Sequence, residues 1–123
     1  MLSIADIVEN LPAHVVYTSS NSSKIQVTDI VAGDLMSDIL VSVNADYLLV
    51  TSLATEQAIR TADISCACAV LLVNDKLPTL QMKKLAQESD ITLLATPLPM
   101  YDACVSLANL QYFSNMSASE SSI

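Results

Sequence analysis

Hydrophobic and polar positions along this chain follow two different spacings, and the changes between them predict where its helices and strands lie. Apolar residues three and four positions apart indicate one face of a helix, whereas alternation or a short continuous apolar run indicates a strand. These patterns predict helices at residues 3–11, 35–43, 54–64, 78–89 and 97–110. They predict strands at residues 14–18, 24–32, 46–52, 66–73 and 91–96.

The order of these elements indicates the fold class. Strands that alternate with helices of about ten residues form crossover units, and such units build a parallel sheet. The apolar run CACAVLLV at residues 66–73 suits a central parallel strand that is covered on both faces. We therefore predict an α/β fold with three α/β/α layers and a mostly parallel sheet of about five strands. Residues 1–113 are expected to form this domain, and the Ser-rich residues 114–123 are expected to be a disordered tail.

Two of the predicted helices carry start signals. Ser3 is followed three residues later by Asp6, which is close to the capping-box pattern. In the helix at residues 78–89, Thr79 is available as a cap. The apolar positions of that helix, Leu80, Met82 and Leu85, are expected to face the core.

The single glycine, Gly33, stands between a predicted strand and a predicted helix. A tight reversal at such a corner often needs a positive φ or a close backbone approach, and glycine tolerates both. The neighbouring Asp34 is expected to cap the helix that follows. The run lacks the glycine pattern of a phosphate-binding loop, so a β-to-α corner is favoured. The alternative, a ligand-binding loop, keeps Gly33 and Asp34 among the candidate binding residues.

Composition and charge narrow the classes of partner and the compartment. The chain carries a net charge of −8 and is 52% hydrophobic. Nucleic acids and anionic membrane surfaces favour a basic patch, so neither is expected as a partner. No segment reaches the roughly 18–20 apolar residues that span a bilayer. The N-terminal stretch has acids but no Lys or Arg, unlike a signal peptide, and a cytoplasmic protein is expected.

The residues most often used in catalysis are few and scattered. Three cysteines, Cys66, Cys68 and Cys104, show neither a disulfide framework nor zinc-ligand spacing. We expect all three in the core, with Cys66 and Cys68 on the same face of a strand. His14 is the only histidine, and no nucleophile stands near it in the sequence to form a catalytic pair. The sequence therefore predicts no catalytic residues and a protein that is not an enzyme.

Three carboxylates, Asp29, Asp34 and Asp38, stand close together in the sequence. Such a group could bind a hard cation such as magnesium. A helix cap and a solvated helix face explain the same residues, and we favour that interpretation. We therefore expect neither a metal nor another cofactor.

Hydroxyl side chains end several of the predicted strands. Thr51 and Ser52 follow one strand and Thr96 ends another. In open α/β sheets, ligands lie outside the carboxyl ends of the strands, at a switch in strand order, and helix starts there offer free N–H groups. A small polar or anionic ligand at this edge is one interpretation. The other is that the hydroxyls only cap the helices that follow.

The second predicted helix carries more apolar residues than one core face needs. These residues are Leu35, Met36, Ile39 and Leu40. A surplus apolar stripe suggests burial against a partner. A homodimer is therefore expected.

Four stretches of the chain occur in a recognisable order: LSIADIVENL, VAGDLMSDIL, ADYLLVTS and DITLLATPLPMYDAC. Together they resemble the DRTGG domain in its free-standing form. That module is found beside CBS domains and within phosphotransacetylases, and it is similar to the N-terminal domain of HPr kinase. The run that names the domain is not present. Free-standing members usually carry a polar segment with His and Asn after the third strand, where this chain has TSLATEQA with Thr55.

The resemblance implies a regulatory α/β domain that is often oligomeric and is not itself catalytic. A distant likeness to paired CBS domains makes an adenine nucleotide the candidate ligand, and a metabolic enzyme the candidate partner. The candidate ligand-binding residues are Gly33, Asp34, Thr51, Ser52, Thr55 and Thr96. The alternative function is a protein-interaction or assembly subunit without a small-molecule ligand.

Overall fold

The computed structural model describes residues 2–42 and 44–121, with side chains to residue 112. Its helices are α1 (Ile4–Asn10), η1 (Ser22–Lys24, a 3₁₀ turn), α2 (Met36–Ser42), α3 (Glu56–Ile64), α4 (Leu80–Ser89) and α5 (Met100–Ser121). Its strands are β1 (His14–Tyr17), β2 (Asp29–Ala32), β3 (Tyr47–Thr51), β4 (Ala69–Leu72) and β5 (Thr92–Ala95). None of the helices in the described ranges is long and apolar enough to cross a membrane.

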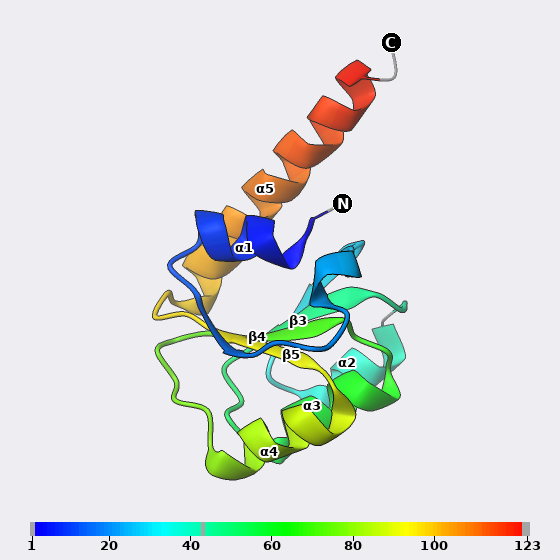
Figure 1. Ribbon diagram of the computed structural model, residues 1–123. Coiled ribbons are helices and arrows are strands. Elements are labelled where there is room, and N and C mark those ends of the chain that lie inside the picture. Colours follow the sequence, from blue (N-terminus) through cyan, green and yellow to red (C-terminus); the bar gives the residue numbers. More distant parts are fainter. Residues whose placement is uncertain (1, 43, 122–123) are drawn as a thin grey trace.

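The five strands form one sheet in the order β1-β5-β4-β3-β2. Strands β2 to β5 are parallel to their neighbours, and β1 runs antiparallel to β5. Because each parallel strand lies beside its predecessor, right-handed crossovers place α2, α3 and α4 on the same face. Helices α1 and α5 cover the other face (Figure 1). The predicted three-layer, mostly parallel α/β fold is therefore confirmed.

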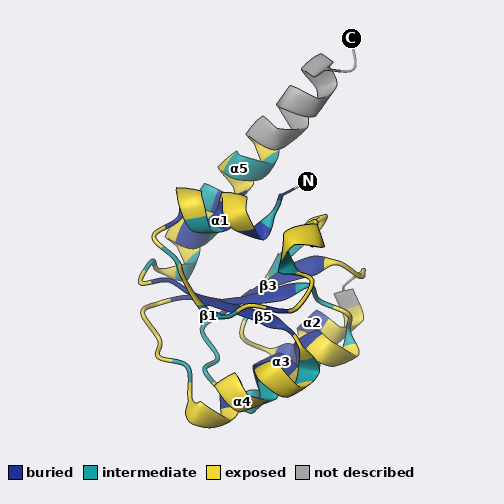
Figure 2. Cartoon of the chain, viewed as in Figure 1, coloured by how far each residue is buried: buried dark blue, intermediate teal, exposed yellow. Residues whose placement is uncertain are grey.

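Two apolar cores lie on the two faces of the sheet. Leu48, Val50 and Leu71 belong to the core under α1 and α5, whereas Leu49 and Leu72 belong to the core under α2, α3 and α4. Successive side chains of a strand point to opposite faces, so strands β3, β4 and β5 are apolar at almost every position. Figure 2 shows these strands buried between helices whose outer faces are exposed.

The helix-start predictions are confirmed. In α1, the backbone N–H of Asp6 donates to Ser3 Oγ at 3.1 Å, and the Ser3 N–H donates to Asp6 Oδ2 at 3.1 Å. In α4, the Met82 N–H donates to Thr79 Oγ1 at 3.1 Å. The prediction that Leu80 faces inward is wrong, because its side chain is 75% exposed whereas Met82 is fully buried.

The predicted strand at residues 24–32 is shorter than expected, because β2 begins at Asp29. Upstream, Val27 pairs with Leu2 instead of with β3: each N–H donates to the other's carbonyl, at 2.7 and 3.2 Å. The alternation in the sequence was real, since Ile25 and Val27 are buried. Its partner is the N-terminus, so the segment 21–28 lies across the end of the sheet.

Two other predictions change at the ends of elements. Cys66 and Cys68 precede β4 and are not part of it; Cys66 is exposed and Cys68 is only partly buried. Helix α5 continues to Ser121, beyond the predicted end at residue 110. Residue 43 of the predicted second helix and the last two residues of the chain lie outside the described residues. Disorder of residues 114–123 and a domain boundary at 113 stay predictions.

Gly33 does not have the backbone conformation that its position suggested. Its φ is not positive, and the left-handed positions in the described residues are held by Asp46, Cys66, Asn74, Asp75 and Asp90. The Gly33 N–H donates to Val50 O at 2.9 Å, so the residue extends the β2–β3 pairing. A Cβ at this position would meet only the Ile39 side chain, at an ordinary 3.5 Å.

We expect Gly33→Ala to raise the free energy of unfolding by about 0.4–1 kcal/mol, because alanine fits this backbone and restricts the unfolded chain. Urea denaturation measures the change. Asn74→Ala is the matched control with the opposite sign, because Asn74 has a φ of 62°, where alanine is strained. A loss of stability in Gly33→Ala would contradict the assignment of Gly33 to an ordinary strand end.

Candidate functional site

The carboxyl ends of β2 and β3 carry a hydrogen-bonded cluster of Asp34, Thr51 and Ser52, here called the carboxyl-edge cluster. The Asp34 carboxylate accepts from Thr51 Oγ1 at 2.9 Å, from the Ser52 N–H at 2.7 Å and from Ser52 Oγ at 2.6 Å. The structure thus brings together three of the sequence-predicted site residues, with Gly33 adjacent in the chain. Asp34 therefore fixes the turn after β3. That Asp34 caps α2 stays a prediction.

Electrostatics keep Asp34 ionised. Burial alone would raise the pKa of this carboxyl group, but the hydrogen bonds from Ser52 and Thr51 and the charge of Lys76 outweigh it, and the pKa is lowered. Thr51 is fully buried, and its Oγ1 also accepts the Leu53 N–H at 3.1 Å. The polar groups of this cluster thus already have partners within the chain.

Thr96 and Thr55 do not join this cluster. Thr96 Oγ1 donates to Pro12 O at 3.0 Å and accepts the Leu98 N–H at 3.3 Å. Side chains alternate along a strand, so Thr96 lies on the same face as Leu94, under α1 and α5. Thr51 lies on the same face as Leu49, under α2, α3 and α4. The two hydroxyls therefore lie on opposite faces of the sheet. Thr55 is the N-cap residue of α3, and its side chain makes no capping hydrogen bond.

The connections after β4 and β5 leave the sheet toward opposite faces, and this is the geometry of a ligand-binding crevice in open α/β folds. Here the loop after β4 is hydrogen-bonded to the segment that follows β5. The Asn74 N–H donates to Leu98 O at 2.8 Å, and the Asp75 N–H donates to Thr96 O at 3.2 Å. Asn74 Oδ1 accepts the Met100 N–H at 3.0 Å and thereby caps α5.

The remaining candidates for chemistry lie apart from one another. His14 pairs with Ala95 at the carboxyl end of β5, whereas Cys66 and Cys68 precede β4 at the opposite edge. Burial raises the pKa of the Cys68 thiol to about 11, and burial also raises the pKa of Cys104. Asp29 Oδ1 accepts the N–H of the next residue at 2.9 Å. Among the described residues, no three His, Cys, Asp or Glu side chains are grouped to hold a metal ion.

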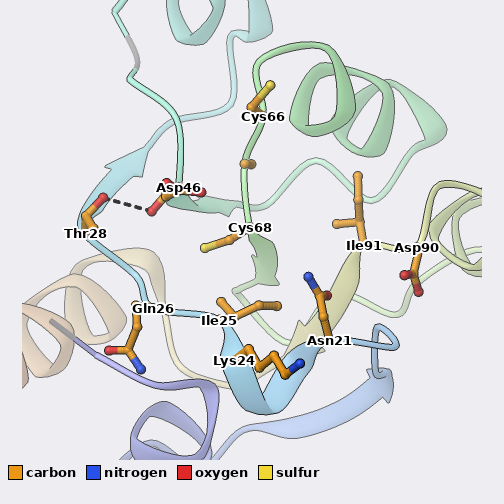
Figure 3. A pocket seen from close by; sticks show the side chains of 11 residues that line it. Asn21, Lys24, Ile25, Gln26, Thr28, Asp46, Cys66, Cys68, Asp90 and Ile91 are labelled. Carbon is orange, nitrogen blue, oxygen red and sulfur yellow. Dashed lines mark hydrogen bonds between the residues drawn. The ribbon is translucent and has the colours of Figure 1, made fainter.

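The opposite edge of the sheet, where the parallel strands begin, holds a cavity of about 550 Å³, here called the amino-edge cavity. The segment 21–28 forms one side, and the residues that lead into β3, β4 and β5 form the other (Figure 3). The lining residues are Asn21, Lys24, Ile25, Gln26, Thr28, Asp46, Cys66, Ala67, Cys68, Asp90 and Ile91. A volume of this size lies within the usual range for small-molecule sites, about 300–1,000 Å³.

Hydrogen bonds hold both ends of the segment that covers the cavity. Asp90 accepts from Tyr17 Oη at 2.7 Å, from the Ser20 N–H at 3.0 Å and from Ser20 Oγ at 2.6 Å. These bonds, those from Ser20 above all, lower the pKa of Asp90, and the hydrogen bond to Asp90 raises the pKa of Tyr17. At the other end, Thr28 donates to Asp46 O through its N–H and its Oγ1, both at 3.1 Å. The cavity therefore has a fixed frame.

Several polar groups in this frame face no partner within the described part of the chain. The Lys24 ammonium, the Gln26 amide, the Asp46 carboxylate and the Cys66 thiol make no hydrogen bond or ion pair with a described residue. Unlike the carboxyl-edge cluster, this cavity has groups available for a ligand. Sequence reasoning missed it because it considered only the carboxyl ends of the strands; the covering segment could be found only once Val27 was known to pair with Leu2.

Comparison with solved structures gives an informative match. No family model matches the chain, and no curated protein matches it. A solved structure does match: the CBS and DRTGG domains of the regulatory region of Clostridium perfringens pyrophosphatase, complexed with the activator diadenosine tetraphosphate. The fold is DRTGG-like. The TM-score is 0.71 at 13% sequence identity, over 83% of this chain and 44% of that chain.

At this level of identity the match shows the fold alone. The chain spans less than half the length of the pyrophosphatase fragment. The resemblance noted in the sequence thus agrees with the shape of the molecule.

Proposed function

We propose that this chain is a non-catalytic regulatory domain of the DRTGG family, which binds a small ligand, acts as a homo-oligomer and serves an enzyme partner. The observation that carries the proposal is the similarity of its fold to a regulatory region that was solved with a nucleotide activator. The amino-edge cavity supports it, because it offers a frame of the right size with unpartnered polar groups.

The amino-edge cavity is favoured over the predicted carboxyl-edge position as the ligand site. A ligand at Asp34, Thr51 and Ser52 would have to replace hydrogen bonds of 2.6–2.9 Å that the chain already makes. A ligand beside Lys24 and Asp46 would break no hydrogen bond of the chain, since neither side chain is bonded to a described residue. Gln26 and Cys66 join Lys24 and Asp46 as the proposed ligand-binding residues.

The arrangement of the nucleophiles supports a regulatory rather than a catalytic role. A cysteine nucleophile needs a low thiol pKa and a base within hydrogen-bond reach. His14 lies at the other edge of the sheet from Cys66 and Cys68. The pKa of Cys68 is raised to about 11, which is the opposite of activation.

A thermal-shift panel tests the proposal. Nucleoside mono-, di- and triphosphates and diadenosine tetraphosphate are each added to the full chain, with sodium chloride of equal ionic strength as the control. At least one compound is expected to raise the melting temperature, because a ligand at ten times its Kd stabilises the fold by about 1.4 kcal/mol. No shift with any compound would contradict a nucleotide-binding function.

A second candidate function, an assembly subunit without a small ligand, is favoured by the surface of α2. Met36 and Ile39 face the core, but Leu35 is 62% exposed and Val41 is 86% exposed. Leu40 is also exposed. This apolar surface supports the predicted homodimer. Sedimentation velocity separates the candidates: an oligomer with no response to the ligand panel favours the assembly subunit, and a monomer argues against it.

A further inference from the structure

Strands β3, β4 and β5 are each preceded by a non-glycine residue with a left-handed backbone, and all three of these residues line the amino-edge cavity. They are Asp46 (φ 65°), Cys66 (φ 62°) and Asp90 (φ 54°). Glycine adopts this conformation without steric cost, yet the single glycine stands elsewhere, at a φ that is not positive. The side chains at these three positions therefore need an explanation.

Asp90 is explained by the fold, because its carboxylate bonds Tyr17 and Ser20. Asp46 and Cys66 are not explained in this way. Asp46 uses only its backbone within the described chain, through its N–H to Cys66 O at 3.0 Å and its O to Thr28. A left-handed residue whose side chain makes no internal contact points to an external one. The Asp46 carboxylate is thus available to a ligand in the cavity.

The two charged groups without partners lie on opposite sides of the cavity. In Figure 3, Asp46 lies beside Thr28 at one side, and Lys24 lies beside Asn21 at the other. Ile25 and Ile91 are buried residues of the lining. Figure 3 shows Ile25 between Asp46 and Lys24, and Ile91 beside Asp90. A ligand that matches this arrangement has hydrogen-bond donors at one end, an apolar body and one anionic group at the other end.

The charge of the lining limits how anionic the ligand can be. Lys24 is the only cation among the lining residues, and Asp46 and Asp90 are both acids. The chain as a whole carries −8. A polyphosphate would meet more repulsion than attraction here, whereas a single phosphate can be neutralised by Lys24.

We propose that the amino-edge cavity binds a purine nucleoside monophosphate whose base presents two adjacent N–H donors, as guanine does. This inference rests on the proposed ligand-binding function and names its ligand class. The phosphate pairs with Lys24, and the base lies against Ile25 and Ile91. A carboxylate has two acceptor oxygens and no donor. Asp46 therefore suits the two donors of the guanine edge better than the donor and acceptor of the adenine edge.

Isothermal titration of the full chain with guanosine monophosphate, adenosine monophosphate, guanosine and inorganic phosphate tests the ligand class. Guanosine monophosphate is expected to bind about tenfold or more tightly than the adenine analogue, because the adenine edge leaves one Asp46 oxygen facing another acceptor. Guanosine contains only the base end of the ligand and phosphate only the anionic end, so each is expected to bind more weakly than guanosine monophosphate. Equal or tighter binding of adenosine monophosphate would overturn the assignment of Asp46.

Two variants locate the two ends of the ligand, and a third is their control. Lys24→Met is expected to weaken the binding of guanosine monophosphate about tenfold, because a charge-assisted bond to the phosphate is lost. The binding of guanosine, which has no phosphate, is expected to stay unchanged. Asp46→Asn, which keeps the left-handed backbone, is expected to lose the guanine preference and to favour xanthosine monophosphate, whose edge has one donor and one acceptor. Lys83→Met, on α4 and outside the cavity lining, is the control and is expected to bind like the wild type. Wild-type behaviour of Asp46→Asn would overturn the inference.

Alkylation of Cys66 distinguishes failure of this inference from failure of the proposed function. Cys66 is the exposed cysteine and lines the cavity. Bound guanosine monophosphate is expected to slow its modification by iodoacetamide, as followed by mass spectrometry. If another nucleotide binds and protects Cys66, the ligand class is wrong and the proposed function stands. If no nucleotide binds, this inference and a nucleotide-binding function are both wrong.

Discussion

Replacing Met82 by alanine is expected to lower the free energy of unfolding by about 2–5 kcal/mol, the range for removing a buried aliphatic side chain of this size. Met82 is fully buried in the core under α2, α3 and α4, together with Ala58 and Leu93. The loss combines the transfer of its side chain to water with the cavity that remains. Urea denaturation followed by circular dichroism measures it.

Leu80 is the matched control on the same helix. Its side chain is exposed, so Leu80→Ala is expected to change stability by no more than about 0.5 kcal/mol. The sequence periodicity placed both residues in the core, whereas in the structure only Met82 is buried. The two variants therefore distinguish the structure from the sequence prediction. A large loss in Leu80→Ala with a small one in Met82→Ala would mean that α4 is rotated about its axis.

Asp34→Ala is expected to lower the free energy of unfolding by about 2 kcal/mol at neutral pH, because it removes three hydrogen bonds and leaves a buried hydroxyl without its acceptor. That hydroxyl is Thr51 Oγ1. Asp34 itself is exposed, so screening by solvent keeps the effect below that of a buried ion. Equilibrium denaturation at pH 7 measures the change.

The loss should also depend on pH. The pKa of Asp34 is lowered in the folded state, so its contribution is fully present above the unfolded pKa of about 3.9. It disappears as the pH falls through the lower folded value. Stabilities of wild type and variant should therefore draw closer together as the pH falls below about 3.9. Asp63→Ala is the control, because Asp63 is an exposed acid on α3 whose carboxylate makes no hydrogen bond with a described residue. An equal, pH-independent loss of stability in both variants would contradict the role of Asp34.

The fold could be predicted from the sequence because its parallel strands are buried on both faces. The runs that became β3, β4 and β5 are continuous and apolar, and few structures other than a covered parallel sheet accept such runs. The periodicity of α4 was informative about its length but not about its rotation, since Leu80 and Met82 are both apolar and only packing decides between them.

The candidate site was predicted less well, for reasons of pairing and conformation. Asp34, Thr51 and Ser52 come together because parallel strands end at one edge, which topology predicts. The hydrogen bonds among them depend on atomic positions that cannot be read from the spacing of residues in the sequence. The amino-edge cavity depends on Val27 pairing with Leu2 and on left-handed residues such as Cys66, and neither has a pattern in the sequence.

The position of the cavity offers a route from ligand to the rest of the molecule. The segment that covers it is hydrogen-bonded to Asp90 at one end, and near the other end Val27 pairs with Leu2, directly before α1. A ligand that contacts Lys24 therefore contacts a segment that is bonded to Asp90, before β5, and to Leu2, before α1. The Leu2–Val27 pairing connects the covering segment to the residues directly before α1.

The central claim is that a small ligand binds in the amino-edge cavity, and nuclear magnetic resonance tests it most directly. The ¹⁵N-labelled chain is titrated with the compound that gives the largest thermal shift, and the perturbed amides are mapped. We predict the largest changes at residues 24–28, at Asp46, at residues 66–68 and at residues 90–91. Changes confined to Gly33, Asp34, Thr51 and Ser52, or no changes at all, would contradict the account.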